Sequence, residues 1–163
     1  DPQEPAVHIT FDEAEDFCKW QGKRLPTRQE WISYGYTEMR DNPPPPLVSG
    51  RTYPYPTGDS PKGANCLGEC GAARGNPAGK KEFSDYLNRG YGHARVGTTK
   101  AGVNGLFDMG ANVWEWARSD QGATAATMGG SWWYGAAQMK AHYGATKPRD
   151  MAAIYIGFRC ISD

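Results

Sequence analysis

The stretch DMGANVWEW, residues 108–116, places two carboxylates seven residues apart with small residues between them. Asp108 and Glu115 offer hard oxygen ligands, and the small residues let the backbone curl so that carbonyl oxygens join them. This composition suits a hard cation such as Ca²⁺. The alternative is a strand that carries one exposed acid and two core tryptophans, Trp114 and Trp116.

The chain has four cysteines, Cys18, Cys66, Cys70 and Cys160. An even number in a small, loop-rich chain favours two disulfides and an oxidising compartment. A four-cysteine metal site is the competing interpretation, but zinc sites prefer two paired knuckles, and here only Cys66 and Cys70 are close in the sequence. The three histidines, at positions 8, 93 and 142, are far apart and lack metal-ligand spacing, so we expect them to be solvated or hydrogen-bonded.

Composition bounds the class of protein. The 163 residues suit one domain, and 21 Gly, 12 Pro and 12% aromatic residues predict a loop-rich α+β fold. Lys plus Arg equals Asp plus Glu at 18 each, so no strong field attracts nucleic acid or an anionic membrane surface. No window approaches the roughly 18 apolar residues of a transmembrane helix.

Two short helices are expected near the start of the chain, each with a capping box. The boxes are TFDE, with Thr10 and Glu13, and TRQE, with Thr27 and Glu30. The inward face of the first helix is predicted to hold Phe11, Ala14, Phe17 and Cys18. Residues 41–79 are rich in Pro and Gly and predict an ordered loop pinned by aromatic rings. Candidate strands follow in VWEWAR, GGSWWYG and AIYIGFRCI.

Five blocks in order, RLPTRQEW, ANC, NGLFDMGANVWEW, GGSWW and GFRC, resemble the formylglycine-generating-enzyme domain, also called the sulfatase-modifying-factor domain. The resemblance covers residues 1–163 as a single domain. It implies a C-type-lectin-like α+β fold with two short helices around a twisted antiparallel sheet and much irregular loop. Family members usually carry a further N-terminal stretch, so we expect this portion to be missing, cleaved or supplied by a companion chain.

The resemblance also implies two structural calcium sites. The first site uses the positions that look like Asp108, Ala111, Val113 and Glu115, two of them through backbone carbonyls. In the second site, the positions that look like Asn65 and the Cys66 carbonyl are completed by an acid and a carbonyl from a later loop. The best-aligned positions for these last two ligands are Asn88 and Gly90. Asn88 replaces an expected acid there, which weakens Ca²⁺ binding because one carboxylate is lost.

Cys18 and Cys160 look like the two cysteines that form a disulfide in the family, so the resemblance implies a Cys18–Cys160 bridge. Cys66 and Cys70 are then left to pair locally. In formylglycine-generating enzymes two cysteines after GGSW bind copper(I). Tyr134 and Met139 stand in that stretch here, and a phenol and a thioether are poor substitutes for thiolates. We therefore expect no copper and no copper-dependent cysteine oxidation.

The frame of the family's peptide groove is retained in the sequence. Aromatic rings with a few polar tips suit a binding cleft, although core packing is the alternative for each tryptophan. The residues expected to line the groove are Trp114, Ser131, Trp132, Trp133, Tyr134 and His142, with Lys147 and Arg149 near its rim.

Three functions follow from this pattern. The first is a secreted or periplasmic accessory or maturation factor that binds a peptide or protein. The second is an oxidoreductase or peptide-modifying enzyme that uses a different metal or residue set. The third is a lectin-like ligand-binding module. No nucleic acid partner and no membrane span are expected.

Overall fold

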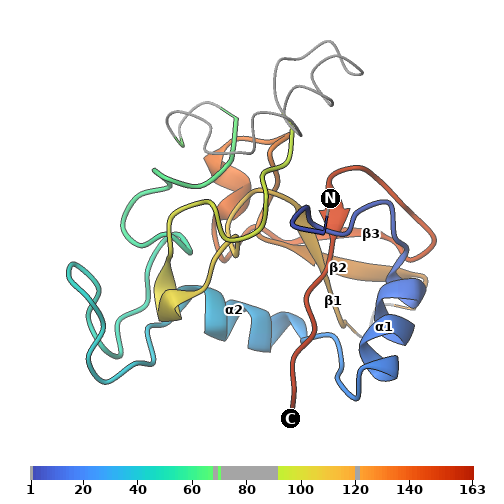
Figure 1. Ribbon diagram of the computed structural model, residues 1–163, viewed down its shortest axis with the longest axis horizontal. Helices are drawn as coiled ribbons and strands as arrows, with labels where there is room; N and C mark the ends of the chain where they lie inside the picture. The colour runs from blue at the N-terminus through green and yellow to red at the C-terminus, as the bar shows by residue number, and fades with distance from the viewer. Residues whose placement is uncertain (1, 68–69, 71–91, 120–121) are drawn as a thin grey trace.

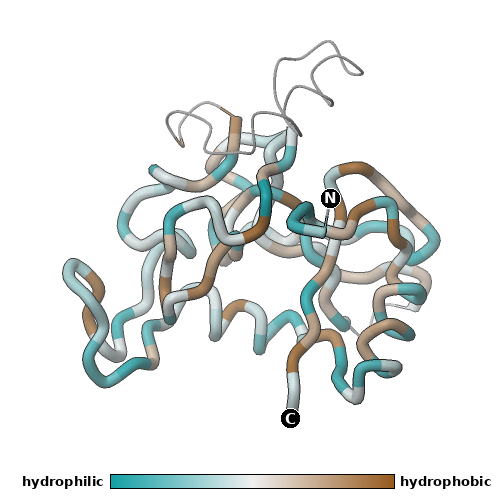
Figure 2. Tube along the Cα trace, viewed as in Figure 1, coloured by the Kyte–Doolittle hydropathy of each residue, from teal (hydrophilic) through white to brown (hydrophobic). Residues whose placement is uncertain are grey.

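The computed structural model describes residues 2–67, 70, 92–119 and 122–163. Helices α1 (Phe11–Trp20) and α2 (Arg28–Tyr36) come first and lie at the right and along the bottom of Figure 1. Both predicted capping boxes are present, because each N-cap threonine accepts from the third helical N–H while the glutamate there accepts from the threonine backbone. Figure 2 shows hydrophilic and hydrophobic residues alternating along α1.

A mixed four-stranded sheet follows the helices, in the order β3-β2-β1-β4. Its strands are β1 (Trp114–Ala117), β2 (Thr124–Met128), β3 (Ala145–Pro148) and β4 (Ile156–Gly157). Strand β1 is central and buried along its whole length. Two 3₁₀ turns, η1 (Val103–Gly105) and η2 (Ala136–Met139), interrupt the loops.

The α+β class is confirmed. The sheet was expected to be antiparallel, but it is mixed. Strand β4 pairs with β1 in parallel, whereas β1 with β2 and β2 with β3 are antiparallel. The reason is that β4 does not continue the meander beside β3. The chain crosses to the far edge and returns in the direction of β1. The segment GGSWWYG forms turns rather than a strand, and the pairing strands β2 and β3 lie on either side of it.

The main core packs α1 against the sheet. Phe11 meets Trp116 edge to face with ring centroids 5.9 Å apart, and both side chains are buried. The Cys18–Cys160 disulfide joins α1 to the segment after β4, where the C-terminal chain runs between the two helices in Figure 1. Phe17 departs from the prediction, because it is 43% exposed and contacts the partly exposed Phe158 instead of the core.

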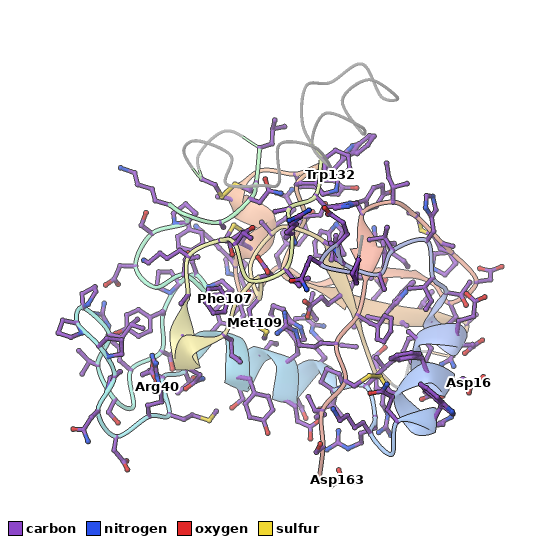
Figure 3. The ribbon with its side chains drawn as sticks, in the orientation of Figure 1. Asp16, Arg40, Phe107, Met109, Trp132 and Asp163 are labelled. Carbon is purple, nitrogen blue, oxygen red and sulfur yellow. A yellow bond between two sulfur atoms is a disulfide. The ribbon has the colours of Figure 1, made fainter. Side chains whose placement is uncertain are left out.

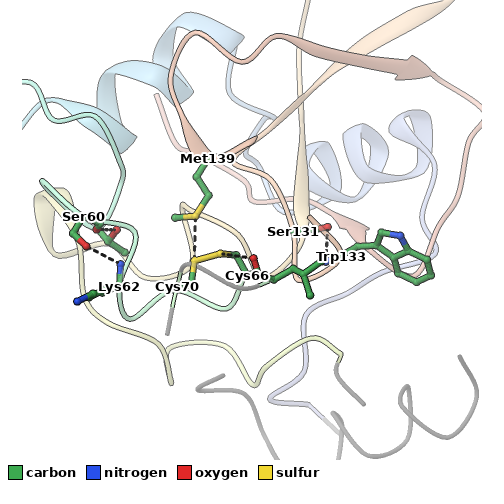
Figure 4. The surroundings of a disulfide bond; sticks show 9 residues. Ser60, Lys62, Cys66, Cys70, Ser131, Trp133 and Met139 are labelled. Carbon is green, nitrogen blue, oxygen red and sulfur yellow. Dashed lines mark hydrogen bonds between the residues drawn. A yellow bond between two sulfur atoms is a disulfide. The ribbon is translucent and has the colours of Figure 1, made fainter. Parts of the chain in front are cut away.

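The second disulfide, Cys66–Cys70, closes a short loop beside η2. Figure 4 shows Met139 facing this disulfide, with its sulfur 3.6 Å from Cys70 Sγ. This is a packing contact rather than a hydrogen bond, since a disulfide sulfur carries no proton. Both pairings that the family resemblance implied are therefore present in the structure.

No described helix has the length and apolar character needed to cross a bilayer. Most of the proline-rich stretch of residues 41–67 folds as turns and bends outside the helices. The hydroxyl oxygen of its buried Tyr53 accepts a hydrogen bond from the Val48 backbone N–H at 2.7 Å. The prediction of an ordered, aromatic-pinned loop is therefore confirmed up to Leu67, while the remainder to residue 79 lies outside the described residues apart from Cys70.

Candidate functional site

The turn that leads into β1 is unusually tight. Asp108, Ala111 and Asn112 all have positive φ, near 60°, a conformation that residues other than glycine rarely adopt. The Asn112 side chain stabilises this geometry, because its carboxamide oxygen accepts from Ala94 N and from Asn65 Nδ2. Figure 3 shows Phe107 and Met109 together at the centre of the molecule, where the chain enters this turn.

Glu115 lies on β1 behind the turn and is held by cationic and neutral donors. Arg159 donates from Nε and Nη2 to its two carboxylate oxygens, each at 2.5 Å. Trp31 Nε1 donates to the same carboxylate at 2.8 Å from helix α2. The Glu115 side chain is 5% exposed, so β1, α2 and the segment after β4 meet at one nearly dry carboxylate.

Asp108 has only neutral donors. Thr99 Oγ1 donates to it at 2.6 Å and Gly97 N at 2.8 Å. Burial raises the pKa of the Asp108 carboxyl above its ordinary value; these two hydrogen bonds offset part of the rise, and the nearby charge of Glu115 adds to it. An ionised Asp108 therefore lacks an ion-pairing partner among the described residues.

Asp108, Val113 and Glu115 line one cavity of about 560 Å³ together with Arg159 and the N-terminal segment 2–6. The cavity thus brings together both acids and one of the two carbonyl positions of the predicted calcium site; Ala111 is not among its lining residues. The donor chemistry fits a calcium ion next to Asp108. At Glu115 an ion would share the carboxylate with the Arg159 guanidinium.

The second predicted calcium site is only partly described. Asn65 is buried, and its amide nitrogen donates to Gly92 O at 3.0 Å and to Asn112 Oδ1 at 3.1 Å. Cys66 is in its disulfide. Asn88 and Gly90 lie outside the described residues. Within the described part of the chain, Asn65 connects two loops.

Four of the predicted groove residues, with two further tyrosines, form a chain of aromatic rings, here called the aromatic cluster: Trp114, Trp132, Trp133, Tyr134, Tyr143 and Tyr155. Trp114 stacks on Tyr143 at 6.1 Å and meets Tyr134 edge to face at 5.7 Å. Trp133 contacts both Trp132 and Tyr155. Tyr143 and Tyr155 belong to the cluster although the sequence did not single them out.

The cluster has a buried layer and an outer layer. Trp114, Ser131 and Trp132 are each only 1% exposed. The two tryptophans are therefore core residues, which is the alternative that the sequence left open. Trp133 and Tyr134 are half-buried, whereas Tyr143 and His142 are exposed. Their part in ligand binding stays a prediction, with the buried rings as a rigid support for the outer ones.

Two basic residues expected at the rim have different positions. Lys147 Nζ lies 5.6 Å from the Trp114 ring, and burial lowers the pKa of its ammonium group below the ordinary value. Lys147 therefore lies next to the aromatic cluster, over its Trp114 ring. Arg149 instead covers the Phe11 ring at 4.1 Å and pairs with Asp12, so it anchors α1.

The positions of the copper-binding cysteines hold no thiol. Tyr134 packs against Trp114, and Met139 is fully buried beside the Cys66–Cys70 disulfide. All four cysteines of the chain are described and lie in disulfides. Of the histidines, His93 is buried with Nε2 2.9 Å from Glu4. Among the described residues no three His, Cys, Asp or Glu side chains form a metal-binding group.

The sulfatase-modifying factor enzyme 1-like domain model matches residues 1–163, the whole chain. This chain therefore belongs to that family, in agreement with its fold and with its ordered motifs. The family includes proteins with and without catalytic activity, as the relatives below show by name.

Inactive C-alpha-formylglycine-generating enzyme 2 of Bos taurus is 28% identical over 169 residues, covering 97% of this chain and 50% of the relative. Hercynine oxygenase of Mycolicibacterium thermoresistibile is 33% identical over 120 residues, covering 72% of this chain and 21% of the relative. The solved structure of PvdO from Pseudomonas aeruginosa has a TM-score of 0.65 at 18% identity, covering 97% of this chain and 61% of that one. This likeness shows the fold. The chain spans about half the length of the first curated relatives it matches.

Proposed function

We propose that this domain is a secreted or periplasmic accessory factor that binds a peptide or protein ligand at its aromatic cluster. It does not carry out copper-dependent cysteine oxidation. The observation that carries the proposal is the state of the sulfur atoms: every cysteine is in a disulfide, and Tyr134 and Met139 stand where copper ligands are expected. Copper(I) binds through soft thiolates, which this chain does not offer.

The outer rings of the aromatic cluster support a binding role. Trp133, Tyr134 and Tyr143 present flat apolar area with polar tips, and rigid aromatic side chains lose little entropy on binding. The buried Trp114 contacts Tyr134 and Tyr143 from beneath, so these rings are pre-organised. An extended peptide with apolar side chains is the ligand that this surface suits best.

The two disulfides support a location outside the reducing cytosol. The Cys18–Cys160 bridge closes most of the chain, with 142 residues of separation, and stabilises the fold by constraining its unfolded state. Such bridges form and persist in oxidising compartments such as the periplasm or the extracellular space.

Calcium at the turn before β1 is part of the same proposal and has a structural role. Asp108, Val113 and Glu115 would hold the ion, since they line one cavity. A bound calcium ion would give the half-buried Asp108 carboxylate a direct cationic partner, which no described ion pair supplies. The ion would stabilise the turn that fixes Trp114 at the start of β1.

The test combines binding to immobilised peptide and glycan arrays with a copper(I) titration in competition with a chelating dye. We expect peptide binding that Trp133→Ala weakens and Trp20→Ala leaves unchanged. Trp20 is the matched control because it is 78% exposed on α1, away from the cluster in the contacts described.

Each alternative function has its own outcome in this test. Binding to glycans alone would favour the lectin-like module and overturn the peptide ligand. Stoichiometric copper or iron in the purified protein, with oxidation of a cysteine-containing peptide in air, would favour the enzyme. Peptide binding equal in the Trp133→Ala variant would remove the aromatic cluster as the site.

A further inference from the structure

A second cavity, of about 260 Å³, lies where helix α2 begins beside the end of β1. Thr27, Arg28, Gln29, Arg118 and Ser119 line it. Two of these five residues are arginines, and none is acidic. The cavity is separate from the calcium turn and shares no lining residue with the cavity there.

The two arginines are held together by the backbone although they are 90 positions apart in the sequence. Arg28 N donates to Arg118 O at 3.1 Å, and Arg118 N donates to Pro26 O at 2.8 Å. Thr27 and Arg118 form a parallel β-bridge. The fold therefore holds the two arginine backbones side by side, and both residues line the same cavity.

The donors in this cavity lack acceptors. Arg28 Nε and Ser119 Oγ are buried and have no hydrogen-bond partner among the described residues. No ion pair to a described carboxylate includes Arg28 or Arg118, whereas Arg24, a few residues away, pairs with Glu30 and Asp163. Buried polar groups in native proteins are almost always paired, so orphaned donors in a cavity indicate an acceptor that binds there.

We propose that this cavity, here called the arginine cavity, binds a tetrahedral oxyanion, phosphate or sulfate, free or as a monoester on a larger ligand. Arg28 and Arg118 supply planar guanidinium donors, which match phosphate and sulfate oxygens in pairs. Ser119 Oγ adds a neutral donor. The site goes beyond the proposed peptide-binding function, because it has a different chemistry and a cavity lined by no residue of the aromatic cluster.

A substitution at Gly144 tests this site without replacing either arginine. A Cβ added at Gly144 would lie 2.8 Å from Arg28 Nη2, closer than van der Waals contact allows. Its backbone has no positive φ, so alanine fits the local conformation. Gly144→Ala should therefore displace the Arg28 guanidinium while both arginines remain in the chain.

The experiment is calorimetric titration of the whole chain with inorganic phosphate, inorganic sulfate and phenyl phosphate at constant ionic strength. We expect saturable binding with one site, weakened about tenfold or more in Arg28→Gln and in Arg118→Gln, because each removes a charge-assisted donor. Gly144→Ala should weaken binding in the same direction. Lys62→Gln is the matched control, since it removes an exposed positive charge elsewhere and should leave binding unchanged.

The comparison of ligands identifies the source of the oxyanion. Tighter binding of phenyl phosphate than of inorganic phosphate supports a ligand-borne group, and equal binding supports a free ion. A titration without saturable heat for any of the three anions, or binding that Arg28→Gln and Gly144→Ala both leave intact, overturns the site. Thermal melting of each variant in chloride verifies folding.

Discussion

Two groups of arginines in this molecule differ in what surrounds them. Arg159 donates twice to the Glu115 carboxylate, and Arg40 donates to buried Glu38 through Nε and Nη2, both at 2.8 Å. Arg28 and Arg118 share the arginine cavity with no described carboxylate. Paired guanidinium groups connect loops to the core, whereas unpaired ones are available to a ligand. The oxyanion proposal therefore assigns binding to arginines other than the ones that pair in the core.

The largest expected effect is at the Glu115–Arg159 pair. Glu115→Gln should lower the free energy of unfolding by about 3 kcal/mol, because it leaves a partly buried guanidinium without its counter-charge. Chemical denaturation measures this loss. Glu15→Gln is the control, since Glu15 pairs with the exposed Lys19 and should change stability by less than about 1 kcal/mol. Equal losses in the two variants would remove the distinction between buried and exposed pairs.

Calcium should give the next largest effect, at Asp108, which forms no ion pair with a described residue. Saturating calcium is expected to raise the free energy of unfolding by up to about 2.7 kcal/mol when it is present at 100 times its dissociation constant. Thermal melting in calcium and in excess chelator provides the measurement. Asp108→Asn should abolish the difference between the two conditions, and identical melting of the unaltered chain in both would count against the site.

Glu38 should make stability depend on acid pH. The hydrogen bonds from Arg40 lower the pKa of Glu38 to about 2 from its ordinary 4.5. Because the folded-state pKa is depressed, its stabilisation is complete above about pH 4.5 and is lost as pH falls toward 2. Glu38→Gln should cost about 1–3 kcal/mol at neutral pH and flatten the acid limb of a pH titration of stability. An unchanged acid limb in this variant would show that other carboxylates dominate.

The smallest stability effect is expected at Arg28. Without a described ion pair to lose, Arg28→Gln should change the free energy of unfolding by less than about 0.5 kcal/mol in chloride. In saturating phosphate the same variant should melt below the unaltered chain, because only the latter gains the binding energy. A large loss in chloride would mean that Arg28 supports the fold itself.

The features that depend on residues close together in the sequence were predicted correctly. Both helices start at the threonines of their capping boxes, because the box needs only residues three apart. The disulfide pairing and the family followed from ordered motifs. The parallel pairing of β4 was missed because two residues carry no periodicity and their partner is a strand about 40 residues earlier.

The sequence singled out Asp108 and Glu115 from their oxygen chemistry, and the two line one cavity, while their role as calcium ligands stays a prediction. The Arg159 partner of Glu115 was missed, although it lies within the GFRC motif that helped to identify the family. Ion pairing over 44 positions is set by tertiary packing, which spacing does not encode. The burial of Trp114 and Trp132 could not be predicted either, since tryptophan occurs both in cores and in binding grooves and the sequence does not distinguish the two.

The bridge between Cys18 and Cys160 has a consequence for handling the protein. It encloses the Cys66–Cys70 loop, the sheet and the arginine cavity within one covalent ring. A protease that cuts the chain once between residues 18 and 160 would leave a molecule of unchanged mass apart from one added water. Such nicked material would separate into two fragments only after reduction, so an intact band on a non-reducing gel does not establish an uncut backbone.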